Sequence, residues 1–277
     1  MPRQGSSKKK RSNSRIRKSA ACTNQLRVDA KEQHRRPSSS KLQGSGTIRS
    51  PKTLKIFDHD LDLQVARRLA RTNLLDIDSE TDGLDYRIHK LRLVQLGTED
   101  NRVYMVRNPR PDSKYLSTVL RSPIPVKIFH HAAFDLRFLK AWIRVEPQGR
   151  IECTKTLLKI THPDLRSGLG TALGRLFKVH LKKVQFDHGH WNDEELTKEQ
   201  LSYAANDVLY LHLLLKKLKT DASWAELARY ERAMKIIPEK AFMEVEGYTD
   251  LWDYPQLAHK DALDYRNWWL SDIPKED

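Results

Sequence analysis

The 277-residue sequence predicts an α/β or α+β domain, because strand-like segments come first and helical segments follow. Short runs of apolar and β-branched residues lie between 73 and 129, and beyond Phe129 the apolar residues recur at helical spacing. Hydrophobic residues make up 39% of the chain, which is enough for a core of ordinary size. No apolar stretch approaches the roughly 20 residues that span a bilayer, so we expect a soluble protein.

The expected elements follow from these patterns in chain order. A helix is predicted over 60–70, followed by strands at 73–80, 91–96, 102–106 and 126–129. Gly83 and Asn101 mark turns between neighbouring strands, which predicts a largely antiparallel sheet at the front of the domain. Further helices are expected at 132–142, 154–160, 169–177 and, as one long stretch, 198–219. Thr197 and Gln200 form a capping box at the start of that stretch.

The positive charge of the chain is concentrated at one end. The formal net charge is +14, and residues 1–55 alone contain 16 Lys and Arg against two acidic residues. Residues 1–52 are rich in Ser, Lys and Arg and have no apolar face, so we predict a disordered basic tail. It is followed by a folded domain at 53–220 and by a net acidic helical or extended extension at 221–277.

The basic tail and the cysteines bear on localisation. The run 8–11 is a nuclear-localisation signal, a phosphate-binding arm or a solvated segment without a specific role. The tail lacks the apolar region of a secretory signal. Cys22 and Cys153 are too few and too distant for a disulfide framework or a cysteine zinc site, which favours a reducing compartment. We therefore expect a cytoplasmic protein, with nuclear or organellar import left open.

The first group of residues with chemical potential is in the segment LLDIDSETDGLD. Asp76, Asp78 and Glu80 alternate, so on a strand all three project from one face. Three carboxylates on one face repel one another unless a hard divalent cation lies between them. The competing interpretation is an acidic turn with solvated side chains. An EF-hand is excluded, because His89 stands where its bidentate Glu belongs.

Two later segments carry further polar residues. In KIFHHAAFDLRFL, His130 and His131 follow a strand and Asp135 opens a helix, where the helix dipole alone would favour an acid. In LTKEQLSYAANDVLYLHLL, Tyr203 and Asp207 are four positions apart and share one helix face. That face is largely apolar, so it is expected to pack on the sheet and to bury Asp207 beside a cation or in a hydrogen bond with Tyr203.

Taken together, D-x-E on a first strand, an Asp after a later strand and Y-x-x-x-D on a late helix resemble the DEDD superfamily of 3′-5′ exonucleases. Ser202 occupies the position where one subgroup has His, so the resemblance is to the Tyr-bearing subgroup. The flanking segments, over about residues 53–255, resemble the RNase D branch and its short, nanoRNase-like forms. The resemblance implies an RNase H-like (DnaQ-like) fold, a mixed sheet flanked by helices, without the helical domains that follow the nuclease in full-length RNase D.

The resemblance also implies a site and a reaction. The catalytic residues would be Asp78, Glu80, Asp135, Tyr203 and Asp207, and the four carboxylates would hold two divalent cations, Mg²⁺ or Mn²⁺. Asp78 would bridge both cations, and Tyr203 would orient the attacking water. The expected reaction is hydrolysis from a 3′ end with release of nucleoside 5′-monophosphates. Substrate contacts are expected from Leu84, as a wedge between terminal bases, and from His130, Lys183 and Gln185.

The sequence leaves several alternatives open. The expected partners are single-stranded RNA or the 3′ ends of short oligonucleotides, with no membrane partner. DNA is the alternative substrate, since contacts with a 2′-hydroxyl depend on three-dimensional geometry. A catalytically idle nucleic-acid-binding relative is the alternative from another functional class. A homo-oligomer is left open because short relatives form rings.

Overall fold

A computed structural model describes residues 49–181, 191 and 195–248. Its strands form one six-stranded sheet in the order β1-β4-β3-β2-β5-β6. The strands are β1 (Thr53–Asp58), β2 (Leu74–Thr81), β3 (Leu91–Gly97), β4 (Arg102–Arg107), β5 (Val126–Phe129) and β6 (Ile151–Cys153). β3 runs antiparallel to both of its neighbours, β2 and β4, whereas the pairs β1–β4, β2–β5 and β5–β6 are parallel. The sheet is therefore mixed, as an RNase H-like fold requires.

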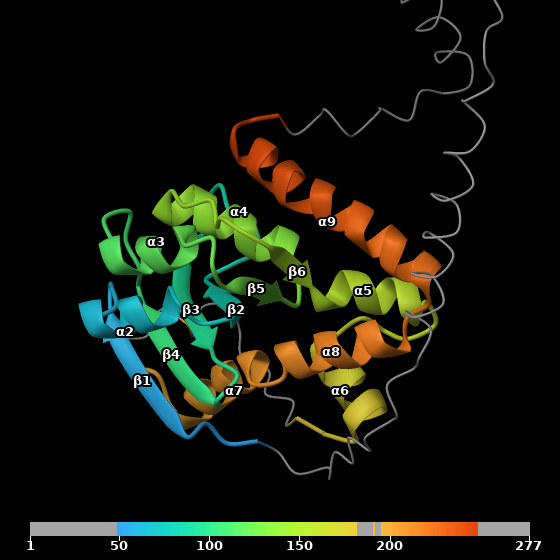
Figure 1. Cartoon of the computed structure of the whole chain (residues 1–277). Helices are drawn as coiled ribbons and strands as arrows, with labels where there is room; N and C mark the ends of the chain where they lie inside the picture. Colours follow the sequence, from blue (N-terminus) through green and yellow to red (C-terminus); the bar gives the residue numbers. More distant parts are fainter. Residues whose placement is uncertain (1–48, 182–190, 192–194, 249–277) are drawn as a thin grey trace, which may run out of the picture. The chain divides into compact units, whose positions relative to one another are not determined.

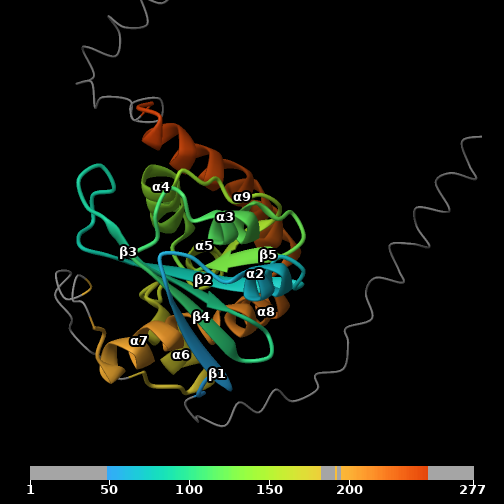
Figure 2. The same ribbon diagram turned by 90° about the vertical axis from the view of Figure 1, so that its left-hand side faces the viewer.

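Helices cover both faces of this sheet (Figures 1 and 2). One face carries α2 (Leu63–Leu69), α3 (Lys114–Arg121) and α4 (Ala132–Ile143), and the other carries α6 (Leu169–Phe177), α7 (Lys198–Val208) and α8 (Leu211–Asp221). α5 (Thr154–Thr161) packs against α8 and α9 (Trp224–Val245), and α9 also lies along α4. None of the helices in this described part is long and apolar enough to cross a membrane.

The alternation along β2 separates the core from the acidic residues. Leu75 and Ile77 are fully buried and pack in the apolar cluster beneath α2, α3 and α4. Asp78 is paired with Gln95 of β3, on the opposite face, towards α7. The apolar residues thus anchor β2 in the core and present its carboxylates to the second helical layer.

The predicted strands at 73–80, 91–96, 102–106 and 126–129 are present. The single helix expected over 198–219 is wrong, because α7 ends at Val208 and α8 begins at Leu211. At this junction the Arg49 backbone N–H donates to the Tyr210 hydroxyl at 2.6 Å, and Arg49 Nη1 donates to the Leu209 carbonyl at 3.2 Å. The junction contains no Gly or Pro that would signal a break in the sequence. Its contacts are with Arg49, which is about 160 residues away in the chain. The capping box at Thr197 is confirmed.

Candidate active site

The site is built around three carboxylates from two elements. Asp78 and Glu80 come from β2, and Asp207 comes from the last turn of α7. Each offers a carboxylate oxygen, and the three oxygens lie within 4.8 Å of one another. All three side chains are half-buried. Oxygen donors gathered in this way match what Mg²⁺ and Mn²⁺ require, and a cation would relieve their mutual repulsion.

Gly97 of β3 allows the end of α7 to pack directly on the sheet. Gly97 of β3 is paired with Asp76 of β2, at the point where α7 ends. A Cβ atom at Gly97 would lie 2.7 Å from the Val208 carbonyl oxygen, which is closer than real Cβ contacts come. The missing side chain therefore lets the backbone at the end of α7 settle on the strand. Asp207 precedes Val208 and is carried to the carboxylates of β2.

Tyr203 lies one helical turn before Asp207, and its hydroxyl donates a hydrogen bond to the Asp207 carboxylate. The negative charge of Asp207, followed by burial, raises the pKa of the Tyr203 phenol. The phenol consequently keeps its proton at neutral pH. Its ring lies against the buried Trp191, with the two ring centroids 6.3 Å apart. The hydroxyl is thus held at the edge of the carboxylate group by both a hydrogen bond and packing.

Asp135 joins the site from the first turn of α4 and is 1% exposed. The Ser79 hydroxyl donates to its Oδ1 at 2.6 Å. Its Oδ2 is buried and has no hydrogen-bond partner among the described residues. A buried carboxylate oxygen without a partner is costly, so its position next to an acidic cluster points to a ligand that supplies positive charge. Asp135 lies outside the group of three close carboxylates, which is compatible with a second or water-mediated cation contact.

The electrostatics of the four carboxyl groups agree with a cation site. Burial raises the pKa of Asp78 to about 7. Burial, together with the negative charges of its carboxylate neighbours, raises the pKa of Glu80 well above its usual range, and burial and the Asp78 charge do the same for Asp135 and Asp207. A bound divalent cation favours the ionised form of each group and reverses these shifts. The residues present therefore fit a hard divalent cation.

Three supporting residues were missed by the sequence analysis. Gln95 of β3 is fully buried, and its Nε2 donates to Glu80 Oε1 at 3.3 Å. Ser79 orients Asp135, and the positive charge of Lys155 on α5 offsets a small part of the rise in the pKa of Asp135. A signal existed for Gln95, which interrupts the apolar run LRLVQLG. Lys155 carried no signal, since its place beside Asp135 depends on how α5 packs.

The predicted substrate contacts have different surroundings. Leu84 follows the buried Gly83 in the loop after β2 and is 66% exposed, so it is free to contact a base. The His130 ring bonds to protein groups through both nitrogens, with Nδ1 2.8 Å from Thr154 Oγ1 and Nε2 2.8 Å from the Ser167 carbonyl. Lys183 and Gln185 lie outside the described residues.

The chain is similar in sequence to known nucleases and to a DNA polymerase. A family model described as 3′-5′ exonuclease matches residues 55–222. Among curated proteins, the chain is 26% identical over 180 residues to DNA polymerase I of Aquifex aeolicus, covering 64% of this chain and 29% of the polymerase. It is 28% identical over 137 residues to Ribonuclease D of Serratia proteamaculans, covering 46% of this chain and 35% of that protein. The match thus spans about a third of these relatives.

Among solved structures, the chain resembles Brucella melitensis NrnC bound to pGG, with a TM-score of 0.66 and 28% identity over 76% of this chain and all of that one. A structure of the same NrnC with bound Mg²⁺ matches with a TM-score of 0.63 and 27% identity, over 75% of this chain and 99% of that one. The segment matched by the family model covers more than half of the chain and contains the carboxylate group and Tyr203. This protein therefore belongs to the 3′-5′ exonuclease family.

Proposed function

We propose that the protein is a 3′-5′ exoribonuclease that hydrolyses RNA or short oligoribonucleotides and releases nucleoside 5′-monophosphates with two divalent cations, Mg²⁺ or Mn²⁺. The observation that carries this proposal is the group of Asp78, Glu80 and Asp207 with the Tyr203 hydroxyl hydrogen-bonded to it. The RNA substrate is supported by the likeness to Ribonuclease D and to an NrnC that binds pGG.

In the proposed site the four carboxylates have distinct tasks. Asp78, Glu80 and Asp207 would hold the first cation, and Asp135 with Asp78 would hold the second. When bound, the cations lower the pKa of the attacking water and stabilise the leaving oxygen. Gln95 holds the Glu80 carboxylate, and Ser79 holds that of Asp135, so neither has to rotate into position on binding. The protonated Tyr203 hydroxyl, fixed by Asp207, orients the attacking water.

Leu84 gives this site a means of selecting the 3′ end of a nucleic acid. Its exposed side chain belongs to the loop that directly follows β2, four residues after Glu80 in the sequence. An apolar side chain there would stack against the terminal bases and separate them, so that the last phosphodiester would lie at the carboxylates. This contact needs unpaired bases, so we propose single-stranded 3′ ends as substrates.

The assay that tests the function uses end-labelled RNA and DNA of two, seven and 25 nucleotides with Mg²⁺ or Mn²⁺. We expect mononucleotides released stepwise from the 3′ end of RNA. The similarity to a DNA polymerase I makes DNA the second candidate substrate. Faster hydrolysis of DNA than of RNA at every length would replace our substrate assignment, and internal cleavage would contradict an exonuclease mode.

Substitutions test the site itself. Asp78→Asn is expected to lower the rate by about 10³-fold or more, because the carboxylate shared by both cations is lost. Tyr203→Phe is expected to lower it by about 10²-fold while leaving Mn²⁺ binding, measured by isothermal titration calorimetry, unchanged. Asp112→Asn, at an exposed acid outside the site, is the matched control and should be fully active. Full activity of Asp78→Asn would refute the assignment.

A further inference from the structure

Four arginines line three neighbouring surface depressions near the start of β2, at the other end of that strand from Glu80. The first depression, of about 260 Å³, is lined by Arg68 and Arg71. The second, of about 480 Å³, is lined by Arg71 and Arg121. The third, of about 470 Å³, is lined by Arg121 and Arg144. Each depression shares an arginine with the next, so the three adjoin one another, and we call Arg68, Arg71, Arg121 and Arg144 the arginine track.

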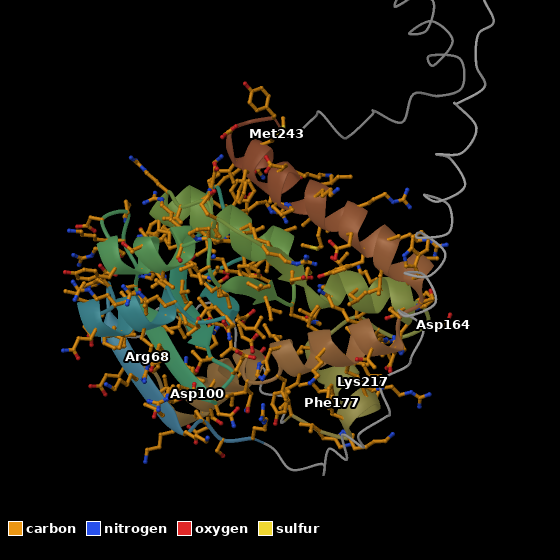
Figure 3. All side chains as sticks on the ribbon, in the orientation of Figure 1. Arg68, Asp100, Asp164, Phe177, Lys217 and Met243 are labelled. Atoms are coloured by element: carbon orange, nitrogen blue, oxygen red, sulfur yellow. The ribbon has the colours of Figure 1, made fainter. Side chains whose placement is uncertain are left out.

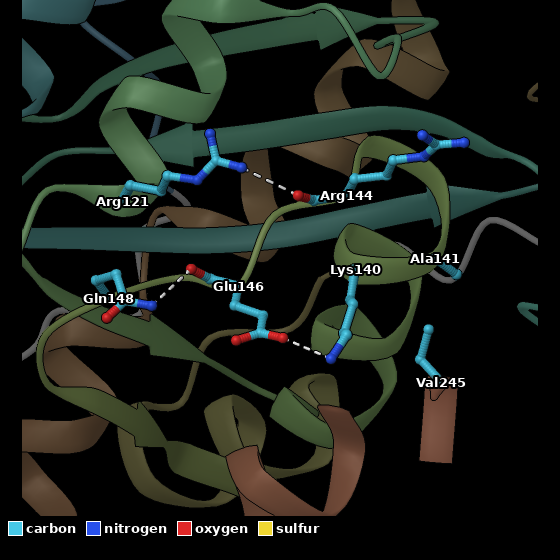
Figure 4. Close-up of a pocket in the computed structure, with 7 residues that line it drawn as sticks. All are labelled: Arg121, Lys140, Ala141, Arg144, Glu146, Gln148 and Val245. Atoms are coloured by element: carbon cyan, nitrogen blue, oxygen red, sulfur yellow. Dashed lines mark hydrogen bonds and ion pairs between the residues drawn. The ribbon is translucent and has the colours of Figure 1, made fainter. Parts of the chain in front are cut away.

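The fold brings these residues together from distant parts of the chain. Arg68 is in the last turn of α2, Arg71 follows that helix, Arg121 ends α3 and Arg144 follows α4. The ends of three helices therefore meet where β2 and β5 begin. Figure 3 shows Arg68 beside Asp100 at the first depression, and Figure 4 shows Arg121 and Arg144 at the third.

The track has more positive than negative charge available for a ligand. Two further cations line the depressions, but Arg102 is paired with Asp100 at 2.7 Å and Lys140 with Glu146 at 2.5 Å. Within the described residues, none of the four track guanidinium groups forms an ion pair with a carboxylate. Arg121 donates to the Arg144 carbonyl at 3.1 Å. Asp100 and Glu146 are taken up by these ion pairs, so among the residues that line the depressions the exposed Glu99 is the one acid left to offset the four arginines.

The helix dipole accounts for part of this arrangement. Cations are favoured in the last turn of a helix, where Arg68 and Arg121 stand. This effect fades beyond the last turn, so it does not explain Arg71 or Arg144, which lie past the ends of α2 and α4. Arginines placed one after another along adjoining depressions match a ligand that carries negative charges at regular intervals. A guanidinium group binds a phosphate through two parallel hydrogen bonds, so the phosphate backbone of a nucleic acid is such a ligand.

We propose that the arginine track is a second binding surface, which holds the phosphate backbone of a single-stranded RNA whose 3′ end occupies the carboxylate site. This inference rests on the proposed function. The track contacts phosphates, so it binds without regard to base sequence. It lies near the start of β2, whereas Glu80 lies six residues along that strand, about 20 Å at about 3.3 Å per residue. Because β2 is buried between two helical layers, the RNA has to pass around the surface, so at about 3.4 Å per nucleotide it needs more than about six nucleotides to reach both.

The test compares the full chain with the variant Arg68→Gln/Arg71→Gln/Arg121→Gln. We expect the hydrolysis rate of a dinucleotide to stay within twofold. Binding of a 25-nucleotide RNA, measured by filter binding in an Asp78→Asn background, should weaken at least tenfold at 0.1 M salt. The slope of log affinity against log salt should fall by about two, as expected for three lost phosphate contacts on a single strand.

The matched control removes the same charge elsewhere. Arg229→Gln/Arg232→Gln/Lys235→Gln neutralises three exposed cations on α9, away from the track. An equal loss of RNA affinity in this control, or an unchanged salt slope in the track variant, would overturn the proposal. Failure of the unmodified protein to hydrolyse any oligonucleotide would instead contradict the proposed function, so the two failures are distinguishable.

Discussion

At the scale of single residues, the site depends on buried polar groups held by partners far away in sequence. Asp76 is 1% exposed, and its Oδ2 lies 2.5 Å from Nδ1 of His212 in the first turn of α8. Its Oδ1 is buried without a hydrogen-bond partner among the described residues. The pair joins the start of α8 to β2, two residues before Asp78. It therefore fixes the junction after α7 next to the carboxylate group.

We predict that His212→Leu lowers the free energy of unfolding by about 3 kcal/mol, because it leaves the Asp76 carboxylate buried with no partner. The double variant Asp76→Leu/His212→Leu should recover most of this loss, since no buried charge remains. Urea unfolding of Asp76→Leu, His212→Leu and the double variant measures this coupling. A double variant as unstable as His212→Leu would show that packing, rather than the buried charge, sets the cost.

At the scale of elements, the important contact is that of α7 with the β2–β3 pair. Asp207 reaches the carboxylates of β2 because the backbone of α7 lies directly on Gly97. The capping box at Thr197 sets where α7 begins, and the contacts of Arg49 with Leu209 and Tyr210 lie where it ends. The helix is thus held at both ends, and its position determines the distance between Asp207 and β2.

We predict that Gly97→Ala lowers hydrolysis at least tenfold and raises the Mn²⁺ concentration for half-maximal activity, because the added methyl displaces the end of α7 that carries Asp207. The loss of stability should be about 1–3 kcal/mol, as for other overpacked sites. Gly170→Ala is the matched control, since a Cβ there meets nothing within 4 Å. An unchanged Mn²⁺ dependence in Gly97→Ala would mean that α7 does not set the geometry of the cation site.

At the scale of the whole molecule, charge is divided between segments. Residues 1–48 carry 13 Lys and Arg against two acidic residues, residues 56–219 have a net charge of +6, and residues 220–277 have a net charge of −6. The boundary at residue 52 expected from composition passes through a segment that contacts the catalytic body, because Arg49 binds the α7–α8 junction. A truncation that preserves this contact removes residues 1–48.

We predict that this truncation leaves dinucleotide hydrolysis within about twofold and weakens salt-sensitive binding of a 25-nucleotide RNA, because the removed cations contribute through long-range attraction to phosphates. Hydrolysis assays and salt titrations of binding measure the two effects, with circular dichroism as the check on folding. Loss of dinucleotide turnover in a well-folded truncation would show that the tail belongs to the catalytic site.

Much of the fold follows from sequence pattern alone. The alternation in LLDIDSE predicts both a strand and the carboxylates on one of its faces, because side chains of a strand alternate between two environments. The four-residue spacing of Tyr203 and Asp207 predicts their shared helix face for the same kind of reason. β1, β6 and α3 were not predicted, and the extension at 221–277 was given no helix bounds such as those of α9. β1 and β6 lie at the two edges of the sheet and pair with strands distant in sequence, which local periodicity does not report.

The sequence by itself thus predicted a domain of both strands and helices, and it predicted the acidic residues Asp78, Glu80 and Asp207 that come together in the structure. The tertiary structure decided the features that depend on contacts between distant segments. These are the break between α7 and α8, the approach of α7 over Gly97, the support of Asp135 and Glu80 by Ser79 and Gln95, and the meeting of four arginines at three helix ends. Local periodicity reports only which face of an element is buried, whereas packing decides which residues of other elements that face meets.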